Sequence, residues 1–213
     1  MEALKDKLRS VIESGLPGQE AQLKMAPSIR NIEALLKKIK PLKRESAVLV
    51  LVYPDENKYK TVLIKRPSYD GPHSGQVSFP GGKFEEQDAD LTATALREAK
   101  EETGINSADV EVIGKMTPLF IPVSNSQVLP VVGFVPYKPV FSPDPAEVDY
   151  IIETDIFRLV EPDAAKTETI LIEDRIIDAP YFDIHGHHVW GATAMMLGEF
   201  REILRLIDKS VRL

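Results

Sequence analysis

Hydrophobic positions near the start of the chain repeat with the spacing of helices. Within residues 1–40, apolar residues recur every three or four positions in two stretches, which predicts two helices. Glycine and proline at residues 15–18 separate the stretches, and Pro41 closes the region. The first stretch places Leu4, Leu8, Val11 and Ile12 on one face, and the second runs from Ile29 to Ile39.

From residue 47 onward the spacing changes to that of strands. AVLVLVY (47–53) and KTVLIK (60–65) flank a turn-rich segment, which predicts a hairpin within a sheet. Strands interleaved with a few helices predict an α/β layered fold around one mixed sheet. The other expected elements are strands at 110–116, 128–135, 148–160 and 168–178, a hairpin at 181–190 and a final helix from about Gly191 to Lys209.

A long loop and a well-bounded helix occupy the middle of the chain. The Gly- and Pro-rich stretch from Pro67 to Gly82 is too long for an ordinary connection, and loops of that length are usually functional. The helix is predicted from about Ala89 to Thr103. Asp88 or Asp90 is suited to cap its start, and Gly104 to end it.

Composition narrows the classes of function. The 213 residues include 26 basic and 33 acidic side chains, and a net charge of −7 makes nucleic acid a poor partner. Without cysteine there is no disulfide or thiolate metal site. The longest apolar run, 47–53, falls short of the ~20 residues of a membrane span. We therefore expect a cytoplasmic protein that does not enter a membrane.

Three carboxylates on the central helix are the main chemical signal. Glu98, Glu101 and Glu102 stand at i, i+3 and i+4, so they project from one face. They could form a solvated acidic face, but together they suit Mg²⁺ or Mn²⁺, which prefer oxygen ligands. Arg97 can reach Glu101, and the Gly81–Gly82 pair upstream lets backbone approach a ligand closely.

The segment from Gly82 to Ile105 resembles the Nudix box, which reads Gly, five residues, Glu, seven residues, then Arg-Glu-U-x-Glu-Glu-x-Gly-U, with U aliphatic. The second half of the box is complete in residues 97–105. In the first half, Asp88 takes the Glu position, and eight residues separate it from Arg97. This lengthened box is similar to that of the coenzyme A pyrophosphatase branch.

The preceding loop resembles the same branch, and the similarity spans about residues 46–200. Leu63, Arg66, Gly75 and residues 79–82 keep the branch pattern. Ile64, Pro67 and Gly71 depart from it, and the last of these replaces an arginine that could pair with a substrate phosphate.

The resemblance implies a Nudix-like α/β/α sandwich with a central mixed sheet at residues 43–213, preceded by an N-terminal helical extension at 1–42. It implies a pyrophosphohydrolase that uses Mg²⁺ or Mn²⁺ and cuts a small nucleoside diphosphate derivative. Coenzyme A, giving adenosine 3′,5′-bisphosphate and 4′-phosphopantetheine, is the favoured substrate. The alternatives are ADP-ribose or another nucleoside diphosphate derivative, and a catalytically silent nucleotide-binding module.

The same resemblance assigns roles around the metal. Glu98 and Glu102 are expected as principal ligands, Glu101 as a further ligand or the base that activates water, and the Gly81 carbonyl as an additional ligand. Arg97 is expected to hold the site together. Outside the helix, Glu147 follows a Pro-rich loop and could act on the nucleophilic water or be an exposed loop residue.

The upstream loop supplies the expected substrate contacts. Arg66 could bind a phosphate with two hydrogen bonds, and Gln76 is a weaker candidate of the same kind. Gly75 and Gly82 could be simple turn residues, and only the box that follows makes them substrate-binding candidates. The sequence IHGHHV favours a hairpin turn over a metal site, and Trp190 is interpreted as a core residue. The apolar faces within residues 1–40 suit packing within the chain or a homodimer contact, and only family habit favours the homodimer.

Overall fold

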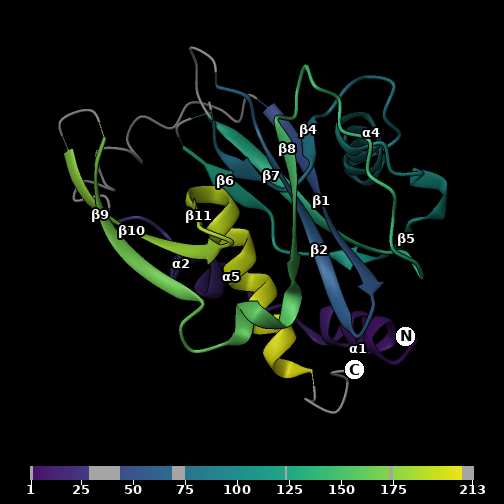
Figure 1. Cartoon of the computed structure of the whole chain (residues 1–213), viewed down its shortest axis with the longest axis horizontal. Coiled ribbons are helices and arrows are strands. Elements are labelled where there is room, and N and C mark those ends of the chain that lie inside the picture. Colours follow the sequence, from purple (N-terminus) through teal and green to yellow (C-terminus); the bar gives the residue numbers. More distant parts are fainter. Residues whose placement is uncertain (1, 29–43, 69–74, 123, 173–174, 208–213) are drawn as a thin grey trace.

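A mixed β-sheet with helices on both faces forms the body of the protein (Figure 1). The computed structural model describes residues 2–28, 44–68, 75–122, 124–172 and 175–207. Eight strands make the sheet: β1 (Arg44–Asp55), β2 (Lys58–Lys65), β3 (Val77–Ser78), β4 (Gly81–Lys83), β5 (Glu111–Lys115), β6 (Leu119–Ile121), β7 (Ser126–Phe134) and β8 (Tyr150–Asp155).

The order of the strands agrees with the predicted mixed sheet. The main path is β3-β2-β1-β7-β5, while β4 pairs with β1, β6 with β7 and β8 with β2. β1 and β7 are parallel, and the β1–β2 hairpin is antiparallel with Tyr53 opposite Lys60. The predicted hairpin is therefore confirmed.

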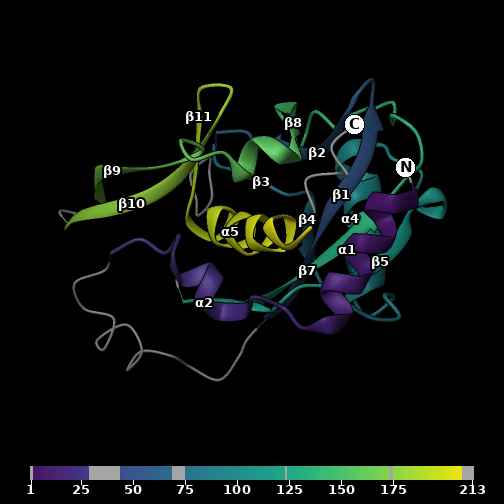
Figure 2. The same ribbon diagram turned by 90° about the horizontal axis from the view of Figure 1, so that it is seen from below.

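Alternation along β1 builds one hydrophobic layer on each face of the sheet. Successive strand residues point to opposite faces, so both faces of this buried strand must be apolar. Helix α4 (Leu91–Thr103) covers one face and α5 (Gly191–Leu206) the other (Figure 2). Ala47, Leu49 and Leu51 join the α4 layer with Ala95 and Ala99, whereas Val48, Val50 and Val52 join the α5 layer with Leu197 and Phe200.

The start of the chain packs into the α5 layer. Helix α1 (Glu2–Ser14) buries Leu4 and Leu8 completely in that layer, as its apolar face predicts. A short helix, α2 (Gly18–Leu23), lies beside α5, where the sequence indicated only a break (Figure 2). The Gln22 amide donates to the buried Glu199 carboxylate of α5 at 2.8 Å. The second predicted helix, 29–39, falls outside the described residues.

The segment before α5 forms a separate three-stranded sheet. It consists of β9 (Ala165–Ile172), β10 (Arg175–Ile184) and β11 (His187–Trp190), in the order β11-β10-β9. The single strand predicted over 168–178 is wrong: Ile172 pairs with Arg175, so the chain reverses there. Both halves are rich in strand-forming residues, and spacing alone did not reveal the reversal.

The predicted hairpin at 181–190 is confirmed in β10–β11. Its turn has His185 at φ 54° and Gly186 at φ 83°, which agrees with the interpretation of IHGHHV as a turn. Two 3₁₀ helices, Ser107–Asp109 and Ile156–Val160, complete the elements, and the second replaces the end of the strand expected over 148–160.

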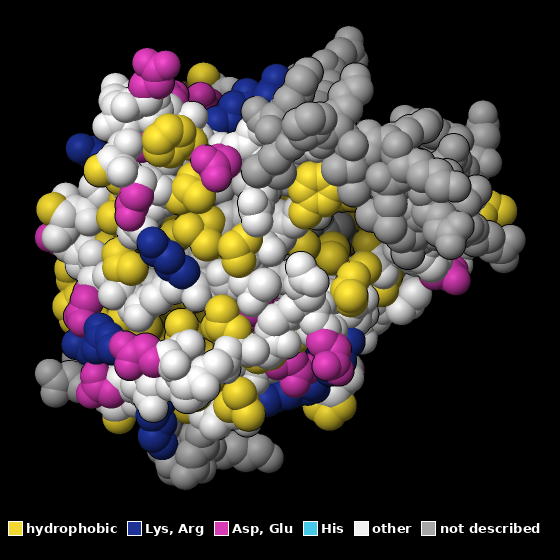
Figure 3. All heavy atoms as spheres, turned by 180° about the vertical axis from the view of Figure 1, so that it is seen from behind, with side chains coloured by type: hydrophobic (Ala, Val, Ile, Leu, Met, Phe, Trp, Pro, Cys, Tyr) yellow, Lys and Arg dark blue, Asp and Glu magenta, His cyan; other side chains and the backbone are white. Residues whose placement is uncertain are grey.

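Acidic and basic side chains stand side by side on the face opposite to that of Figure 1 (Figure 3). One such group joins α1 to β5, where Arg9 and Lys5 bind the Glu111 carboxylate at 2.6 and 3.0 Å. Among the helices that the structure describes, none combines the length and apolarity needed to cross a membrane.

Candidate active site

Helix α4 begins and ends at residues suited to those positions. Asp90 caps the helix, and its carboxylate accepts from the Ala93 backbone N–H at 2.8 Å. Gly104 ends it at φ 74°, a conformation that glycine adopts without a steric penalty. The helix therefore begins at Leu91, two residues after the predicted start, and Asp88 lies outside it.

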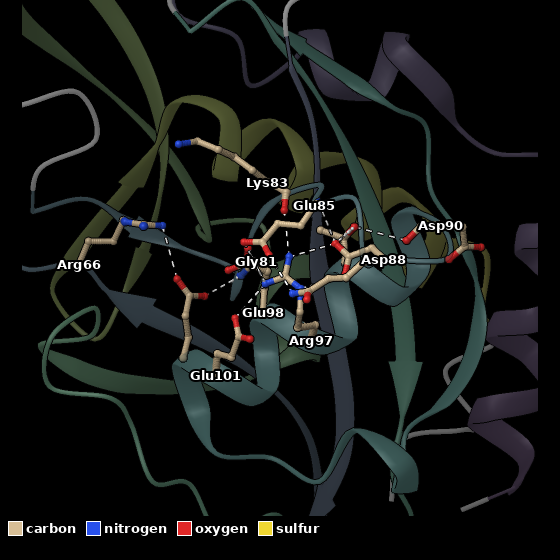
Figure 4. A network of polar contacts seen from close by, with 12 residues as sticks. Arg66, Gly81, Lys83, Glu85, Asp88, Asp90, Arg97, Glu98 and Glu101 are labelled. Carbon is tan, nitrogen blue, oxygen red and sulfur yellow. Dashed lines mark hydrogen bonds and ion pairs between the residues drawn. The ribbon is translucent and has the colours of Figure 1, made fainter.

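Asp88 instead holds Arg97 in place, a pairing that the sequence analysis missed. Nε and Nη2 of Arg97 donate to the two Asp88 oxygens at 2.8 and 3.0 Å, and the Thr94 hydroxyl donates at 2.8 Å. These hydrogen bonds hold the pKa of the buried Asp88 carboxyl well below its ordinary value. Arg97 also donates to the Lys83 carbonyl at 3.0 Å, so it joins the loop to the helix (Figure 4).

The expected pairing of Arg97 with Glu101 is present as well. Nη1 of Arg97 lies 2.9 Å from the Glu101 carboxylate and 3.1 Å from that of Glu98. The Glu101 side chain is 53% exposed, whereas that of Glu98 is 14% exposed. Arg97 therefore neutralises part of the acidic face, and Glu101 occupies its outer rim.

Three carboxylates from two separate parts of the chain converge beside α4. Glu98 and Glu102 come from the helix and Glu147 from the loop before β8, and each offers an oxygen within 4.8 Å of the other two. Glu102 is 1% exposed, Glu98 is half-buried and Glu147 is exposed. These three residues, the acidic cluster, have one buried side and one side open to solvent.

Burial makes Glu102 resist ionisation. Burial first, and then the charges of Glu98 and Glu147, raise the pKa of Glu102 to about 7, although two contacts oppose the rise. The Gly81 backbone N–H donates to this carboxylate at 2.7 Å, and Nη1 of Arg66 lies 3.7 Å from it. Burial also raises the pKa of Glu98. The acidic cluster thus has unfavourable negative charge that a cation would relieve.

Gly81 and Gly82 allow the backbone to come close to the acidic cluster. Gly81 has φ +153°, and a Cβ atom there would lie 2.3 Å from the Ala47 carbonyl oxygen. A Cβ atom at Gly82 would lie 2.4 Å from the Glu98 carboxylate. Real Cβ contacts are never that short, so a side chain at Gly82 would displace Glu98.

The expected substrate-binding residues lie at the end of β2. Arg66 is half-exposed, and its side chain extends toward the acidic cluster (Figure 4). Its backbone N–H donates to the Gln76 carbonyl at 3.0 Å. Gly75 has φ +62°, and its N–H donates to the Pro67 carbonyl at 3.1 Å. The structure therefore brings Arg66, Gln76 and Gly75 together, next to the carboxylates of α4.

Comparisons with known proteins identify the family of the chain. A sequence profile of the NUDIX domain matches residues 43–178. The chain is 32% identical over 161 residues to Nudix hydrolase 15, mitochondrial, of Arabidopsis thaliana, an alignment that covers 73% of this chain and 56% of the relative. It is 35% identical to an uncharacterised Nudix hydrolase, NudL, of Enterobacter sp. (strain 638), covering 74% of this chain and 81% of the relative.

The fold also matches a solved structure. RenU, a Nudix hydrolase from M. smegmatis, superposes with a TM-score of 0.55 at 12% identity, covering 78% of this chain and 88% of RenU. The chain spans about half the length of the plant relative that it matches. The profile match and the identity to its relatives show that this chain belongs to the Nudix family.

Proposed function

We propose that this protein is a pyrophosphohydrolase that uses a divalent cation to cleave the diphosphate of a small nucleotide-derived substrate. The observation that carries the proposal is the convergence of Glu98, Glu102 and Glu147 within 4.8 Å of one another. Three carboxylates at that separation repel one another unless a cation or protons sit among them. Membership of the Nudix family supports the same conclusion.

The donor set suits Mg²⁺ or Mn²⁺. All three groups offer oxygen, which these ions prefer, and the opening on the Glu147 side leaves room for water and phosphate oxygens. Glu98 and Glu102 would hold the metal, together with Glu147 or Glu101 and the Gly81 carbonyl. A divalent cation bound there would neutralise charge on adjacent phosphates and make its bound water a stronger nucleophile.

Other side chains bind the phosphate, accept the proton of the attacking water and position the helix and the loop. Arg66, whose Nη1 lies 3.7 Å from the Glu102 carboxylate, binds a phosphate oxygen and offsets charge on the leaving group. Glu147 is exposed and accepts the proton of the attacking water, while Glu101 is the alternative base. Arg97 is engaged by Asp88 and Glu101, so it positions the helix and the loop. The Gly82 backbone lets Glu98 keep its place.

Coenzyme A is the substrate that the sequence supports best. Water would add to one phosphorus of its diphosphate, and the bridging oxygen would leave with the other phosphate. The products are adenosine 3′,5′-bisphosphate and 4′-phosphopantetheine. The resemblance of the loop 63–82 to the coenzyme A pyrophosphatase pattern supports this choice, and ADP-ribose is the closest alternative.

Incubation of the purified protein with coenzyme A or ADP-ribose, each with Mg²⁺ or with EDTA, tests the proposal. We expect 4′-phosphopantetheine, identified by mass, only in the tube with coenzyme A and Mg²⁺. Cleavage of ADP-ribose but not of coenzyme A would support the class of reaction and overturn the assignment of coenzyme A as the substrate. If the protein cleaves neither coenzyme A nor ADP-ribose but binds one of them tightly, a catalytically silent module would be favoured.

A further inference from the structure

A pocket of about 420 Å³ lies beside the acidic cluster but outside it. Its walls come from the end of β2, from residues 75–77 and from the β10–β11 hairpin, which follows β2 by more than a hundred residues. Trp190, which the sequence placed in the core, is instead half-buried and forms part of this wall. The side chains of Lys65, His187, His188 and Trp190 are among those that line the pocket.

The pocket and the acidic cluster share the end of one strand. Lys65 lines the pocket, while the next residue, Arg66, reaches the Glu102 carboxylate. Consecutive Cα atoms lie about 3.8 Å apart, and consecutive strand residues point to opposite faces. The backbone N–H of Asp149, two residues after Glu147, donates to the Lys65 carbonyl at 2.8 Å. Because Lys65 and Arg66 are adjacent in the chain, the pocket and the acidic cluster share the same end of β2.

The charge that lines the pocket is positive. The Lys65 ammonium donates to the Gly75 carbonyl and forms no ion pair with a carboxylate in the described part of the chain. An ammonium carries three donors, and the hydrogen bond to Gly75 uses one of them. The described residues that line the pocket include no aspartate or glutamate. A phosphate group is the anion that such a site suits.

Flat rings complete the walls. The His187 ring lies 5.6 Å from the ring of Tyr150, centroid to centroid, and the His188 ring stacks on Tyr181 at 4.2 Å. Nδ1 of His188 also lies 2.8 Å from the Glu168 carboxylate, which fixes that imidazole. His187 and Trp190 are both half-buried and line the pocket, where the first offers a hydrogen-bonding ring and the second an apolar plane.

We propose that this pocket binds the phosphorylated nucleoside end of the substrate. A phosphate attached to the ribose, outside the scissile diphosphate, binds Lys65 and His187, and the base lies against Trp190. The inference rests on the proposed function, because it needs a substrate whose diphosphate reaches Arg66. Lys65 would supply the cation that the chain lacks at Gly71, where the branch pattern has an arginine.

Trp190 offers a direct test, because it is the only tryptophan in the chain and its fluorescence reports on the pocket. Adenosine 3′,5′-bisphosphate and AMP, which lacks the 3′-phosphate, are titrated into the wild type, Lys65→Met and Lys58→Met. Lys58 is exposed at the opposite end of the same strand and serves as the matched control. Each titration is repeated by calorimetry.

We expect the bisphosphate to change the fluorescence of the wild type. Lys65→Met should weaken its binding at least about tenfold, because a charge-assisted hydrogen bond is lost, and should leave AMP within about twofold. Lys58→Met should match the wild type. The urea midpoint of each variant controls for folding, because a variant that keeps the midpoint of the wild type is folded.

Two results would overturn the inference: binding of the bisphosphate that leaves the fluorescence unchanged, or an equal loss of both ligands in Lys65→Met. Its failure is separable from that of the proposed function. If the protein cleaves coenzyme A but its fluorescence does not respond to the bisphosphate, the proposed pocket is wrong and the proposed enzymatic function stands. If the fluorescence responds to the bisphosphate in a way that depends on Lys65 but coenzyme A is not cleaved, the proposed pocket stands and the proposed enzymatic function is wrong.

Discussion

Replacing Glu102 by Gln should stabilise the metal-free protein at alkaline pH. Glutamine keeps the shape of the side chain and can still accept from the Gly81 backbone N–H, but it cannot ionise. In the wild type, the pKa of Glu102 rises from 4.5 to about 7 on folding, chiefly because the carboxyl is buried. The unfolded chain therefore loses this proton more easily than the folded protein does.

The size of the effect follows from the shift. A pKa difference of 2.5 at about 1.4 kcal/mol per unit gives roughly 3 kcal/mol. Because the pKa of the folded state is the higher one, the penalty is absent below pH 4.5, develops between pH 4.5 and 7 and is complete above pH 7. Loss of the 3.7 Å contact with Arg66 reduces the gain in the variant by a small amount.

Urea unfolding in EDTA at pH 4 and pH 8 measures this difference. At pH 8 the midpoint of the variant should lie above that of the wild type by about 1 M or more, since m for urea is about 1–3 kcal/mol per molar. At pH 4 the two midpoints should coincide. Mg²⁺ should raise the midpoint of the wild type at pH 8 and barely that of the variant. Equal midpoints at pH 8 would refute the claim that burial raises the pKa of Glu102.

Three further substitutions probe separate contacts. Gly82→Ala should weaken Mn²⁺ binding and turnover by about tenfold or more, with little change in the thermal midpoint, because the new Cβ displaces the Glu98 carboxylate rather than the backbone. Asp88→Asn should lower the free energy of unfolding by about 3 kcal/mol, measured in urea, since it leaves Arg97 without its buried partner. Gln22→Ala should cost about 1–3 kcal/mol in the same assay, because a buried carboxylate of α5 loses a donor; an unchanged midpoint would show that α2 contributes little.

The parts of the structure that the sequence predicted are those encoded locally. Helix α4 has apolar periodicity, a capping residue at its start and a glycine at its end. The sequence therefore predicted both the helix and its acidic face. The apolar run 47–53 predicted a strand, and the structure places β1 there. The first helix followed from the spacing of Leu4 and Leu8 in the same way.

Contacts between distant segments could not be read in this way. Glu147 could be singled out, but its place beside Glu98 depends on how β8 pairs with β2. The sequence suggested Glu101 for Arg97, whereas Asp88, which lies outside the helix, accepts two hydrogen bonds from Arg97 and Glu101 accepts one. Trp190 is apolar, and only the packing of β11 near β3 shows that it faces a pocket.

The most direct test of the account is hydrolysis of coenzyme A by Glu98→Gln, compared with the wild type and Glu86→Gln, with Mg²⁺ or EDTA. Glu86 is exposed in the loop before α4 and controls for the loss of one acidic charge near the site. We expect Glu98→Gln to lower kcat by about a hundredfold or more, Glu86→Gln to match the wild type and EDTA to abolish all turnover. Turnover that persists in EDTA, or in Glu98→Gln at the rate of Glu86→Gln, would contradict the claim that the acidic cluster is a metal-dependent catalytic site.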